Sequence, residues 1–273
     1  RSAMLSGWIC QGYFLQRSRR LLDRAGRGVG VSYLDNLFSL KGKVAIVTGA
    51  SRGNGKAIAD GFCDARAIVY NLDVINGDAS KANFISCDIT NDENLKNAVD
   101  MIHKKEGHID ILVNNAGITR SSYSSESWDD TYKVNLRAPY VLTKMVVEHM
   151  KSTHAGSIIN ITSLNAEQAF PGNPSYVSFK GALKQLTKSV ALDFGKYNIR
   201  ANNVGPGYMK TKMTEKSWNN KDSNKQRSEK TMLGRWGTPE DLVGVSIFLA
   251  SAASNYVTGQ DIYVDGGWLT KGL

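Results

Sequence analysis

Short apolar runs alternate with helix-like segments from residue 43 onward, and this alternation constrains the fold more than any other feature of the 273-residue chain. The first run, residues 44–47, is continuously apolar, which is typical of a strand buried on both faces. The seven runs lie at residues 44–47, 67–72, 83–87, 109–113, 157–161, 199–204 and 261–264. Strands that alternate with helices indicate a parallel sheet covered on both faces. We therefore predict an α/β fold with one doubly wound domain and a seven-stranded parallel sheet.

The first 39 residues differ from the rest because they show no strand or helix period. They hold six arginines against two acidic residues. We predict that residues 1–39 form an N-terminal extension (a leader, a tag or an organelle-targeting segment) and that residues 40–273 form the domain. The longest apolar-leaning run, residues 243–253, covers only about half a membrane span. No membrane partner is therefore expected.

Charge and cysteine content narrow the possible partners. The net charge is +9 and the pI about 9.4, but no dense basic stripe is interleaved with aromatic residues. We therefore expect no nucleic-acid partner and an attraction for anionic ligands. The three cysteines, Cys10, Cys63 and Cys87, are widely spaced and form no metal-type pair. They predict a reducing, cytoplasmic location and no metal site, with organelle targeting by residues 1–39 as the alternative.

Two helices carry recognisable end signals. Thr90 and Glu93 have the spacing of a capping box, and Gly107 is expected to end the helix that they open. The sequence Thr238-Pro239-Glu240-Asp241 supplies an N-cap, a proline at the first helical position and acids in the first turn.

A glycine-rich turn follows the first apolar run. In doubly wound folds, ligands bind outside the carboxyl ends of the strands. Gly49, Gly53 and Gly55 have the spacing G-x-x-x-G-x-G, which lets the backbone approach a pyrophosphate at a helix N-terminus. The alternative is an ordinary tight strand–helix connection. We predict dinucleotide contacts from Gly49, Ser51, Arg52, Gly53, Asn54 and Gly55.

The residues after the second strand bear on the choice of cofactor. Asn71 and Asp73 stand there. An acid at this place accepts hydrogen bonds from the adenosine ribose and repels a 2′-phosphate, so Asp73 favours NAD. Arg52 in the glycine-rich turn could instead pair with the 2′-phosphate of NADP, which is not excluded. An ordinary turn acid is the alternative for Asp73.

Two further strand ends complete the predicted cofactor cleft. Asp88 and Ile89 follow the third strand, where they are placed to meet an adenine. A turn before the helix at Thr90 is an equally good interpretation of Asp88. After the fourth strand, Asn115, Ala116 and Gly117 put an amide and small residues beside the cleft, where bulky side chains would block a cofactor.

A Tyr-x-x-x-Lys pair places a phenol and an ammonium on one helix face. The lysine charge is expected to lower the tyrosine pKa from about 10, so that the phenol can exchange a proton with a carbinol oxygen. Three such pairs occur: Tyr140/Lys144, Tyr176/Lys180 and Tyr208/Lys212. Only Tyr176 follows a serine, Ser163, that ends an apolar run at a strand's carboxyl end. We therefore predict that Ser163, Tyr176 and Lys180 are catalytic and that the other two pairs are ordinary helix or loop residues.

Together these motifs resemble the short-chain dehydrogenase/reductase family over about residues 40–270. The shared residues are Thr48-Gly49-x-x-x-Gly53-x-Gly55, Asn114-Asn115-Ala116-Gly117, Asn135, Ser163, Tyr176-x-x-x-Lys180 and Pro206-Gly207. The resemblance implies a Rossmann-type sheet, a nicotinamide cofactor that also contacts Pro206 and Gly207, and a homotetramer. Departures occur at Asn54, at Asp64 and at Asn71, which stands where the family usually has an acid and so makes the NAD prediction less secure.

The family also implies roles for a catalytic tetrad. Tyr176 would be the general acid in ketone reduction and the base in alcohol oxidation, and Ser163 would donate a hydrogen bond to the substrate oxygen. Lys180 would hold the nicotinamide ribose and keep Tyr176 acidic. Asn135 would order a water that relays protons to Lys180, with a helix-kink residue as the alternative.

Residues 207–233, here called the lid, are expected to choose the substrate and to be mobile. Within the lid, Thr211 is placed to touch the cofactor amide. Arg120, after the fourth strand, could pair with a substrate carboxylate or be an ordinary surface residue.

Three stretches of the sequence are most similar to the group of gluconate 5-dehydrogenases and 2-deoxygluconate 3-dehydrogenases. They are residues 37–43, 233–242 and 264–268. We therefore predict an NAD(P)-dependent oxidoreductase that interconverts a small-molecule secondary alcohol, such as gluconate, and its ketone. A 3-oxoacyl-acyl-carrier-protein reductase and a non-catalytic dinucleotide-binding protein are the alternatives.

Overall fold

The computed structural model describes residues 32–77 and 80–271, in two units that comprise residues 1–37 and 38–273. The described part of the first unit is essentially one short helix, α2 (Tyr33–Phe38). The Ser32 hydroxyl accepts from the Asp35 amide, and the Asp35 carboxylate accepts from the Ser32 amide, each at 3.1 Å. This reciprocal pair caps the helix. A functional boundary at residue 39 stays a prediction.

The second unit is built on a seven-stranded, all-parallel sheet, as predicted. The strand order is β3-β2-β1-β4-β5-β6-β7, so the chain reverses direction across the sheet between β3 and β4. The strands are β1 (Val44–Thr48), β2 (Ile68–Asp73), β3 (Asn83–Ser86), β4 (Ile111–Asn114), β5 (Gly156–Ile161), β6 (Ile199–Pro206) and β7 (Asp261–Val264). The carboxyl ends of β1 and β4 therefore lie side by side at the topological switch point, where such sheets bind ligands.

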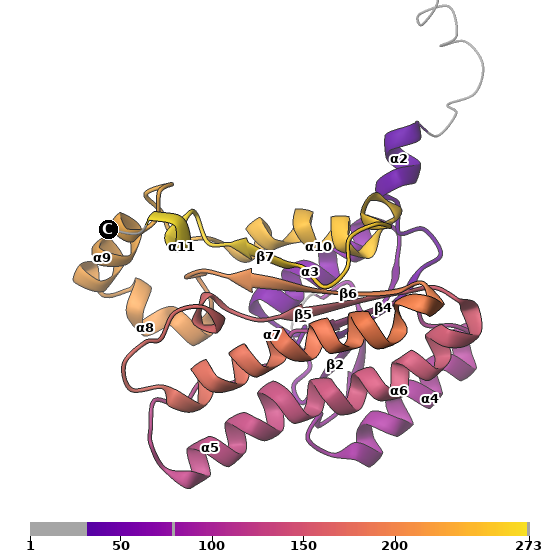
Figure 1. Cartoon of the computed structure of the whole chain (residues 1–273), viewed down its shortest axis with the longest axis horizontal. Coiled ribbons are helices and arrows are strands. Elements are labelled where there is room, and N and C mark those ends of the chain that lie inside the picture. The colour runs from indigo at the N-terminus through magenta and orange to yellow at the C-terminus, as the bar shows by residue number, and fades with distance from the viewer. Residues whose placement is uncertain (1–31, 78–79, 272–273) are drawn as a thin grey trace, which may run out of the picture. The chain divides into compact units, whose positions relative to one another are not determined.

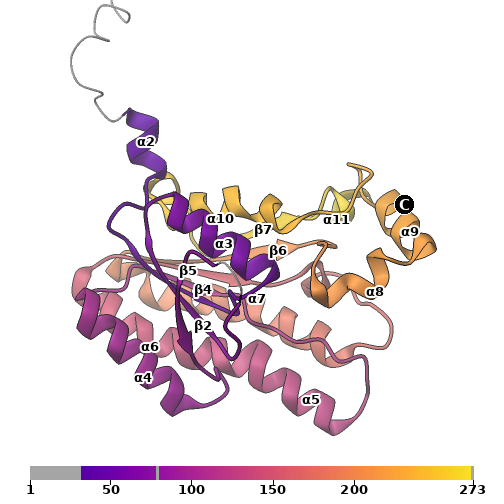
Figure 2. The same cartoon turned by 180° about the vertical axis from the view of Figure 1, so that it is seen from behind.

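Helices cover both faces of this sheet (Figure 1). On one face, α4, α6 and α7 bury a core with Leu95, Leu142 and Val190 against the strands. On the other face, α3 and α10 bury Ile58, Phe62 and Leu249. The view from behind shows the same two layers, with α8, α9 and α11 together at one end (Figure 2). The helices are α3 (Gly53–Asp64), α4 (Asp92–Glu106), α5 (Ser125–Tyr132), α6 (Ala138–Thr153), α7 (Pro174–Phe194), α8 (Glu215–Trp218), α9 (Lys221–Lys230), α10 (Val243–Ala250) and α11 (Trp268–Lys271).

The predicted helix ends are correct with one exception. Gly107 ends α4 in the left-handed conformation, with φ 81°. The prediction that Thr90 caps this helix is wrong, because Asn91 is the N-cap and its side chain accepts from the amides of Glu93 and Asn94. Thr238 does form the predicted cap, but it opens a 3₁₀ turn that leads into α10.

A π-helical turn joins α5 to α6 at Lys133–Arg137. This turn inserts Asn135 between the two helices with its side chain fully buried. Turns of this kind interrupt α-helices at functional sites more often than elsewhere. A helix kink at Asn135 was the alternative to its predicted proton-relay role, and the π-helical turn agrees with that alternative.

A chain of buried amides crosses the sheet beneath its carboxyl edge. Asn114 of β4 donates to Asn160 of β5 at 2.8 Å, and Asn160 donates to the Thr187 hydroxyl of α7 at 2.7 Å. Thr187 in turn lies 2.6 Å from the side-chain oxygen of Asn203 on β6, which also donates to Asp261 of β7. The network ties four strands to α7 with each amide paired.

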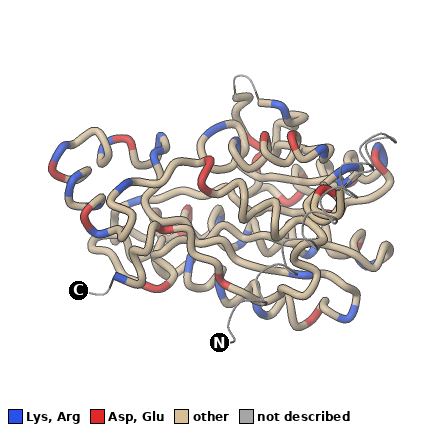
Figure 3. Tube along the Cα trace, turned by 90° about the horizontal axis from the view of Figure 1, so that it is seen from above, with Lys and Arg blue, Asp and Glu red and all other residues tan. Residues whose placement is uncertain are grey.

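Charged residues are spread over the described chain. Lys and Arg segments alternate with Asp and Glu segments along the trace and form no single stripe (Figure 3). Among the helices of residues 32–77 and 80–271, none is long and apolar enough to cross a membrane.

Candidate active site

The glycine-rich turn is built so that side chains cannot be added to it. Gly49 and Gly53 adopt φ of 65° and 57°. A Cβ on Gly49 would lie 2.9 Å from the Ala116 Cα, and a Cβ on Gly55 would lie 2.3 Å from the Asn115 side-chain nitrogen. Both contacts are closer than real side chains tolerate. The β1–α3 turn therefore packs directly on the segment after β4.

The amino end of α3 offers donors that no side chain claims. Arg52 is the N-cap, and its side chain makes no capping hydrogen bond. The first amides of a helix lack intrahelical partners and attract anions. Asn54, in this first turn, also has a buried side-chain oxygen without a partner. The turn thus fits a phosphate-bearing group of the predicted kind.

The side chains after β2 are held against the glycine-rich turn. Buried Asn71 accepts from the Ala50 amide at 2.9 Å and donates to the Ser51 hydroxyl at 2.9 Å. The two carboxylate oxygens of Asp73 accept from the amides of Ser51 and Ile75 at 3.1 and 3.3 Å. Arg52 is exposed and has no ion-pair partner among the described acids. Asp73 is thus occupied by the backbone, whereas Arg52 faces solvent.

Asp88 and Ile89 lie one strand further along the same edge. The Asp88 carboxylate accepts from the amide and hydroxyl of Thr90 at 2.9 and 2.8 Å. This is the turn-forming arrangement that the sequence left open as an alternative. Ile89 packs partly buried against the core beside α4. A role for either residue in holding adenine stays a prediction.

The segment after β4 forms the other wall of the glycine-rich turn. The Asn115 side chain donates to the carbonyl oxygens of Thr48 and Gly49 at 2.9 and 3.1 Å. The amide of Ala116 donates to the Thr48 hydroxyl at 3.0 Å. A Cβ on Gly117 would lie 3.4 Å from the Asn135 side-chain oxygen and 3.7 Å from the Lys180 Nζ. Gly117 therefore connects the predicted cofactor turn with the predicted catalytic residues.

The structure brings Ser163, Tyr176 and Lys180 together at the carboxyl end of β5. Ser163 follows this strand, is nearly buried, and accepts from the Asn165 amide at 3.1 Å. Lys180 is buried on α7, where its Nζ donates to the Ile161 carbonyl at 2.7 Å and lies 5.7 Å from the centre of the Tyr176 ring. Tyr176 and Lys180 thus share one face of α7, which they present to the strand end.

Burial governs the charge states of this cluster. It raises the pKa of Tyr176 above 10, and the Ser163 hydroxyl, which hydrogen-bonds the phenol, opposes that shift. Burial also lowers the pKa of Lys180 to about 8. Desolvation disfavours both the phenolate and the ammonium. The expectation that Lys180 keeps the pKa of Tyr176 low is therefore wrong for the protein alone.

Asn135 is held by both ends of its amide. It accepts from the Ile118 amide at 2.9 Å and donates to the Ile118 carbonyl at 2.8 Å. The π-helical turn therefore anchors the segment after β4 next to Gly117. The structure gives Asn135 a positioning contact, and the predicted proton relay stays a prediction.

Pro206 ends β6, and Gly207 and Thr211 follow it at the same edge. Gly207 approaches β7 so closely that a Cβ would lie 2.7 Å from the Asp265 Cα. The Thr211 side chain sits over the glycine-rich turn, 3.5 Å from where a Cβ on Gly53 would be. The start of the lid therefore touches the predicted cofactor turn.

One residue of the site was missed from the sequence, because Tyr208 was interpreted as an ordinary residue. Tyr208 follows β6, the strand that pairs with β5 and so ends beside Ser163. Tyr208 packs against Trp236 and Trp268, with ring centres 5.3 and 5.1 Å away, and against Phe170 at 6.0 Å. Its position directly after β6 was the available signal. Tyr140, by contrast, is half-exposed on α6.

Unpaired polar atoms gather around this strand edge. Five buried side-chain atoms of the described residues have no hydrogen-bond partner: Asn54 Oδ1, Asn173 Oδ1, Ser217 Oγ, Trp218 Nε1 and Arg227 Nε. Asn54 belongs to the glycine-rich turn, and Asn173 is the N-cap of α7. The other three belong to α8 and α9 of the lid. Such atoms are rare in folded proteins and call for a polar partner.

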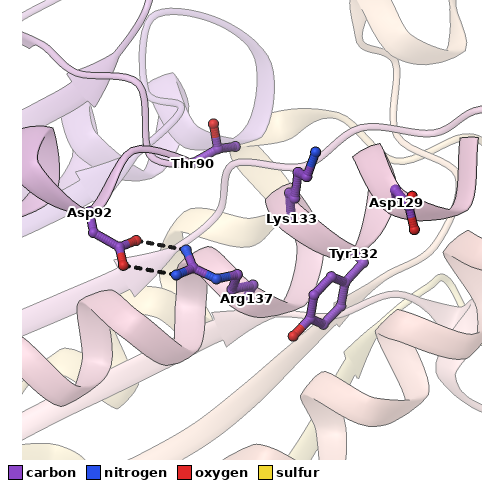
Figure 4. Close-up of a pocket in the computed structure, with 6 residues that line it drawn as sticks. All are labelled: Thr90, Asp92, Asp129, Tyr132, Lys133 and Arg137. Atoms are coloured by element: carbon purple, nitrogen blue, oxygen red, sulfur yellow. Dashed lines mark hydrogen bonds and ion pairs between the residues drawn. The ribbon is translucent and has the colours of Figure 1, made fainter. Parts of the chain in front are cut away.

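Arg120 lies at the surface, which is the alternative that the sequence left open. Its guanidinium pairs with Asp130 of α5 at 3.1 Å, and both side chains are partly exposed. A separate groove of about 510 Å³ lies between the start of α4 and the α5–α6 junction. Arg137 and Asp92 form a two-bond ion pair there (Figure 4). No predicted site residue lines this groove.

The chain is similar to proteins of known type along most of its length. Residues 49–269 match the profile of a family described as enoyl-(acyl carrier protein) reductase. The chain is 38% identical to gluconate 5-dehydrogenase of Gluconobacter oxydans, covering 85% of this chain and 96% of that protein. It is also 38% identical to the 3-oxoacyl-(acyl-carrier-protein) reductase FabG of Thermotoga maritima, covering 84% and 98%.

A solved structure shares both the fold and the type of cofactor. It is a gluconate 5-dehydrogenase from Burkholderia cenocepacia in complex with NADP and tartrate, with a TM-score of 0.83 and 33% identity over 87% of this chain and 99% of that chain. The fold and these matches define the class: the protein is an NAD(P)-dependent oxidoreductase that acts on CH–OH groups. The chain belongs to the short-chain dehydrogenase/reductase family.

Proposed function

We propose that this protein interconverts gluconate, or a closely related sugar acid, and its keto acid. Curated proteins of similar sequence are gluconate dehydrogenases and a keto-gluconate reductase. The observation that carries the proposal is the juxtaposition of Ser163, Tyr176 and Lys180 below a lid with unpaired polar groups. Such groups suit a substrate that carries many hydroxyls and a carboxylate.

The proposed chemistry assigns one task to each residue. The bound nicotinamide supplies or accepts the hydride. Tyr176 gives its phenolic proton to the carbonyl oxygen during reduction and takes it back during alcohol oxidation. Ser163 donates to that oxygen as negative charge develops on it. Lys180 holds the ribose, and Asn135 positions Gly117 through Ile118.

Replacement of the phenol tests this assignment. Tyr176→Phe is expected to reduce turnover by at least about 100-fold and to leave cofactor affinity within about twofold. Tyr140→Phe is the matched control, because Tyr140 has the same spacing to a lysine but lies half-exposed on α6. Equal activity of the two variants would remove Tyr176 from the mechanism.

A second candidate function is reduction of a 3-oxoacyl thioester, favoured by the similarity to the Thermotoga maritima enzyme. The two functions separate in one assay panel. Gluconate is tested with NADP⁺ and NAD⁺, 5-keto-gluconate with NADPH, and an acetoacetyl thioester with NADPH. A higher kcat/KM for the thioester would reject the sugar-acid proposal.

NADP is our proposed cofactor of choice. Asn71 stands where the family usually has an acid and is neutral, and the Asp73 carboxylate is held by the backbone amides of Ser51 and Ile75. Exposed Arg52 can pair with that phosphate. Arg52→Gln should lower the kcat/KM ratio of NADP⁺ to NAD⁺ about tenfold or more. The control is Lys41→Gln, which removes a charge at the opposite end of β1, and an unchanged ratio in Arg52→Gln would favour NAD.

The quaternary state and location are further proposals. Trp128, Tyr132, Tyr140 and Leu192 are exposed apolar side chains on α5, α6 and α7, which suits a homotetramer that buries these helices. Light scattering coupled to gel filtration measures the assembly, and a monomeric mass would reject it.

The unpaired thiols among the described residues suit the cytoplasm. We also propose that residues 1–39 are dispensable for catalysis, which deletion followed by the activity assay tests.

A further inference from the structure

Arg227 of α9 has no anionic partner among residues 32–77 and 80–271. Its guanidinium lies over the Tyr208 ring, 4.7 Å from the ring centre. One terminal nitrogen makes a single long contact, 3.5 Å, to the Ser223 carbonyl of the same helix. The Nε atom is buried and has no hydrogen-bond partner. A guanidinium that is withdrawn from water in this way is costly unless an acceptor meets it.

Other partly buried arginines of the described residues are paired. Arg137 forms a two-bond ion pair with Asp92 at 2.6 and 2.8 Å. Arg200 donates to the carbonyl oxygens of Leu249 and Ser251. Because structural arginines here have found their acceptors, the unpaired fork of Arg227 needs a different explanation.

Tyr208 connects Arg227 with the catalytic cluster. It follows β6, and its ring has Arg227 on a face and the side chains of Trp236, Trp268 and Phe170 around it. Tyr208, Trp236, Trp268 and Phe170 thus form one aromatic cluster after β6, the strand that pairs with β5. A guanidinium stacked on an aromatic face keeps its edge donors free for a planar anion.

The nearby acids do not compete for Arg227. The cavity next to Tyr208, of about 130 Å³, is bordered by Asp241 and Asp265. Asp241 is neutralised by Arg235. Asp265 accepts from the amides of Gly267 and Leu269, at 2.9 Å each. The guanidinium of Arg227 is therefore available to a ligand, because Asp241 and Asp265 already have hydrogen-bond partners of their own.

We propose that Arg227 binds the carboxylate of the substrate and that Tyr208 holds its guanidinium in place beside Tyr176. The proposal rests on the sugar-acid function given above and makes Arg227, rather than Arg120, the residue that selects acids. A carboxylate matches the planar fork of an arginine with two parallel hydrogen bonds. The unpaired donors of Ser217 and Trp218 on α8 then face the hydroxyls of the same molecule.

The test compares substrates that differ in one charge. Gluconate and glucitol have the same hydroxyl skeleton, and only gluconate carries a carboxylate. Arg227→Gln should raise KM for gluconate about 10- to 100-fold, with kcat changed less than threefold and kcat/KM for glucitol unchanged. Arg227→Lys should give an intermediate KM, since it keeps the charge and loses the fork. Lys225→Gln is the matched control on the exposed face of α9 and should behave as wild type.

Calorimetric titration of gluconate in the presence of NADP⁺ separates this inference from the proposed function. If wild type binds gluconate without turning it over and Arg227→Gln does not bind it, Arg227 is the anchor and the sugar-acid function is wrong. If wild type turns over gluconate and Arg227→Gln keeps its KM, or Arg120→Gln alone raises it, the anchor is wrong and the function stands. If wild type neither binds nor oxidises gluconate, both are rejected.

Discussion

A methyl group added at Gly55 tests how tightly the glycine-rich turn packs on the segment after β4. The Cβ of Gly55→Ala would lie 2.3 Å from the Asn115 side-chain nitrogen and 2.4 Å from the Gly49 carbonyl oxygen. The first of these atoms donates to the carbonyls of Thr48 and Gly49. The carbonyl oxygen belongs to the backbone and cannot rotate away. The new methyl group must therefore displace Asn115, the turn, or both.

The expected cost follows from these contacts. Two hydrogen bonds of about 1 kcal/mol each are lost, and overpacking adds about 1–3 kcal/mol. Replacing a helical glycine by alanine returns about 1 kcal/mol. The net loss is about 2–4 kcal/mol, which lowers Tm by about 5–15 °C for a domain of this size. The Kd for NADP should rise at least tenfold, because the displaced turn carries the donors expected to bind phosphate.

Gly244→Ala is the matched control for this prediction. Gly244 is also a helical glycine, on α10, but a Cβ there meets nothing within 4 Å. The same chemical change should therefore stabilise the protein by about 0.5–1 kcal/mol and leave the Kd for NADP unchanged. Thermal unfolding by circular dichroism and fluorescence titration of the cofactor measure both effects. If Gly55→Ala were as stable as Gly244→Ala, the close approach inferred here would not exist.

Other predictions concern buried polar groups. Thr187→Val removes a hydroxyl that joins two buried amides and should lower stability to urea by about 2–4 kcal/mol; a loss below 0.5 kcal/mol would contradict this. Burial and the stacked His103 lower the pKa of His149 below 6.5, so stability should fall as the pH drops below 6.5. His149→Gln should lose less Tm between pH 7 and pH 5 than wild type, and equal losses would exclude this histidine. Because the pKa of Tyr176 lies above 10, kcat/KM for alcohol oxidation should rise up to about pH 10, whereas ketone reduction should not fall over the same range; parallel profiles would refute the acid/base assignment.

The sheet was predictable because its signal is local. A strand buried on both faces requires a continuous apolar run, and each predicted run became a strand within about two residues of its expected ends. The glycine-rich turn was predictable for a similar reason, since Gly49 and Gly53 adopt positive φ and Gly55 touches Asn115. These properties depend on the residue itself and on its immediate neighbours.

The parts that the sequence did not reveal depend on contacts between distant segments. Tyr208 becomes part of the site only because β6 ends beside β5 and because the rings of Trp236 and Trp268 hold it there. The pKa of Tyr176 was expected to fall under the influence of Lys180, but the burial of both groups outweighs their spacing. How deeply a side chain is buried depends on how the whole domain packs, and residue spacing along one helix does not determine it.

Buried side-chain amides of this domain differ in whether they have hydrogen-bond partners, and the two kinds lie in different places. Asn160 and Asn203 lie beneath the carboxyl edge of the sheet, and their amides are paired through Thr187. Asn54 and Asn173 lie at the turn and helix start that border the same edge, and each has an unpaired side-chain oxygen. All four are asparagines, so residue type cannot tell them apart. A paired amide stabilises the fold, whereas an unpaired one costs free energy in the protein alone and is retained when a ligand supplies its partner. The unpaired atoms of the described residues lie in the glycine-rich turn, at the start of α7 and in the lid, all of which border the proposed binding site.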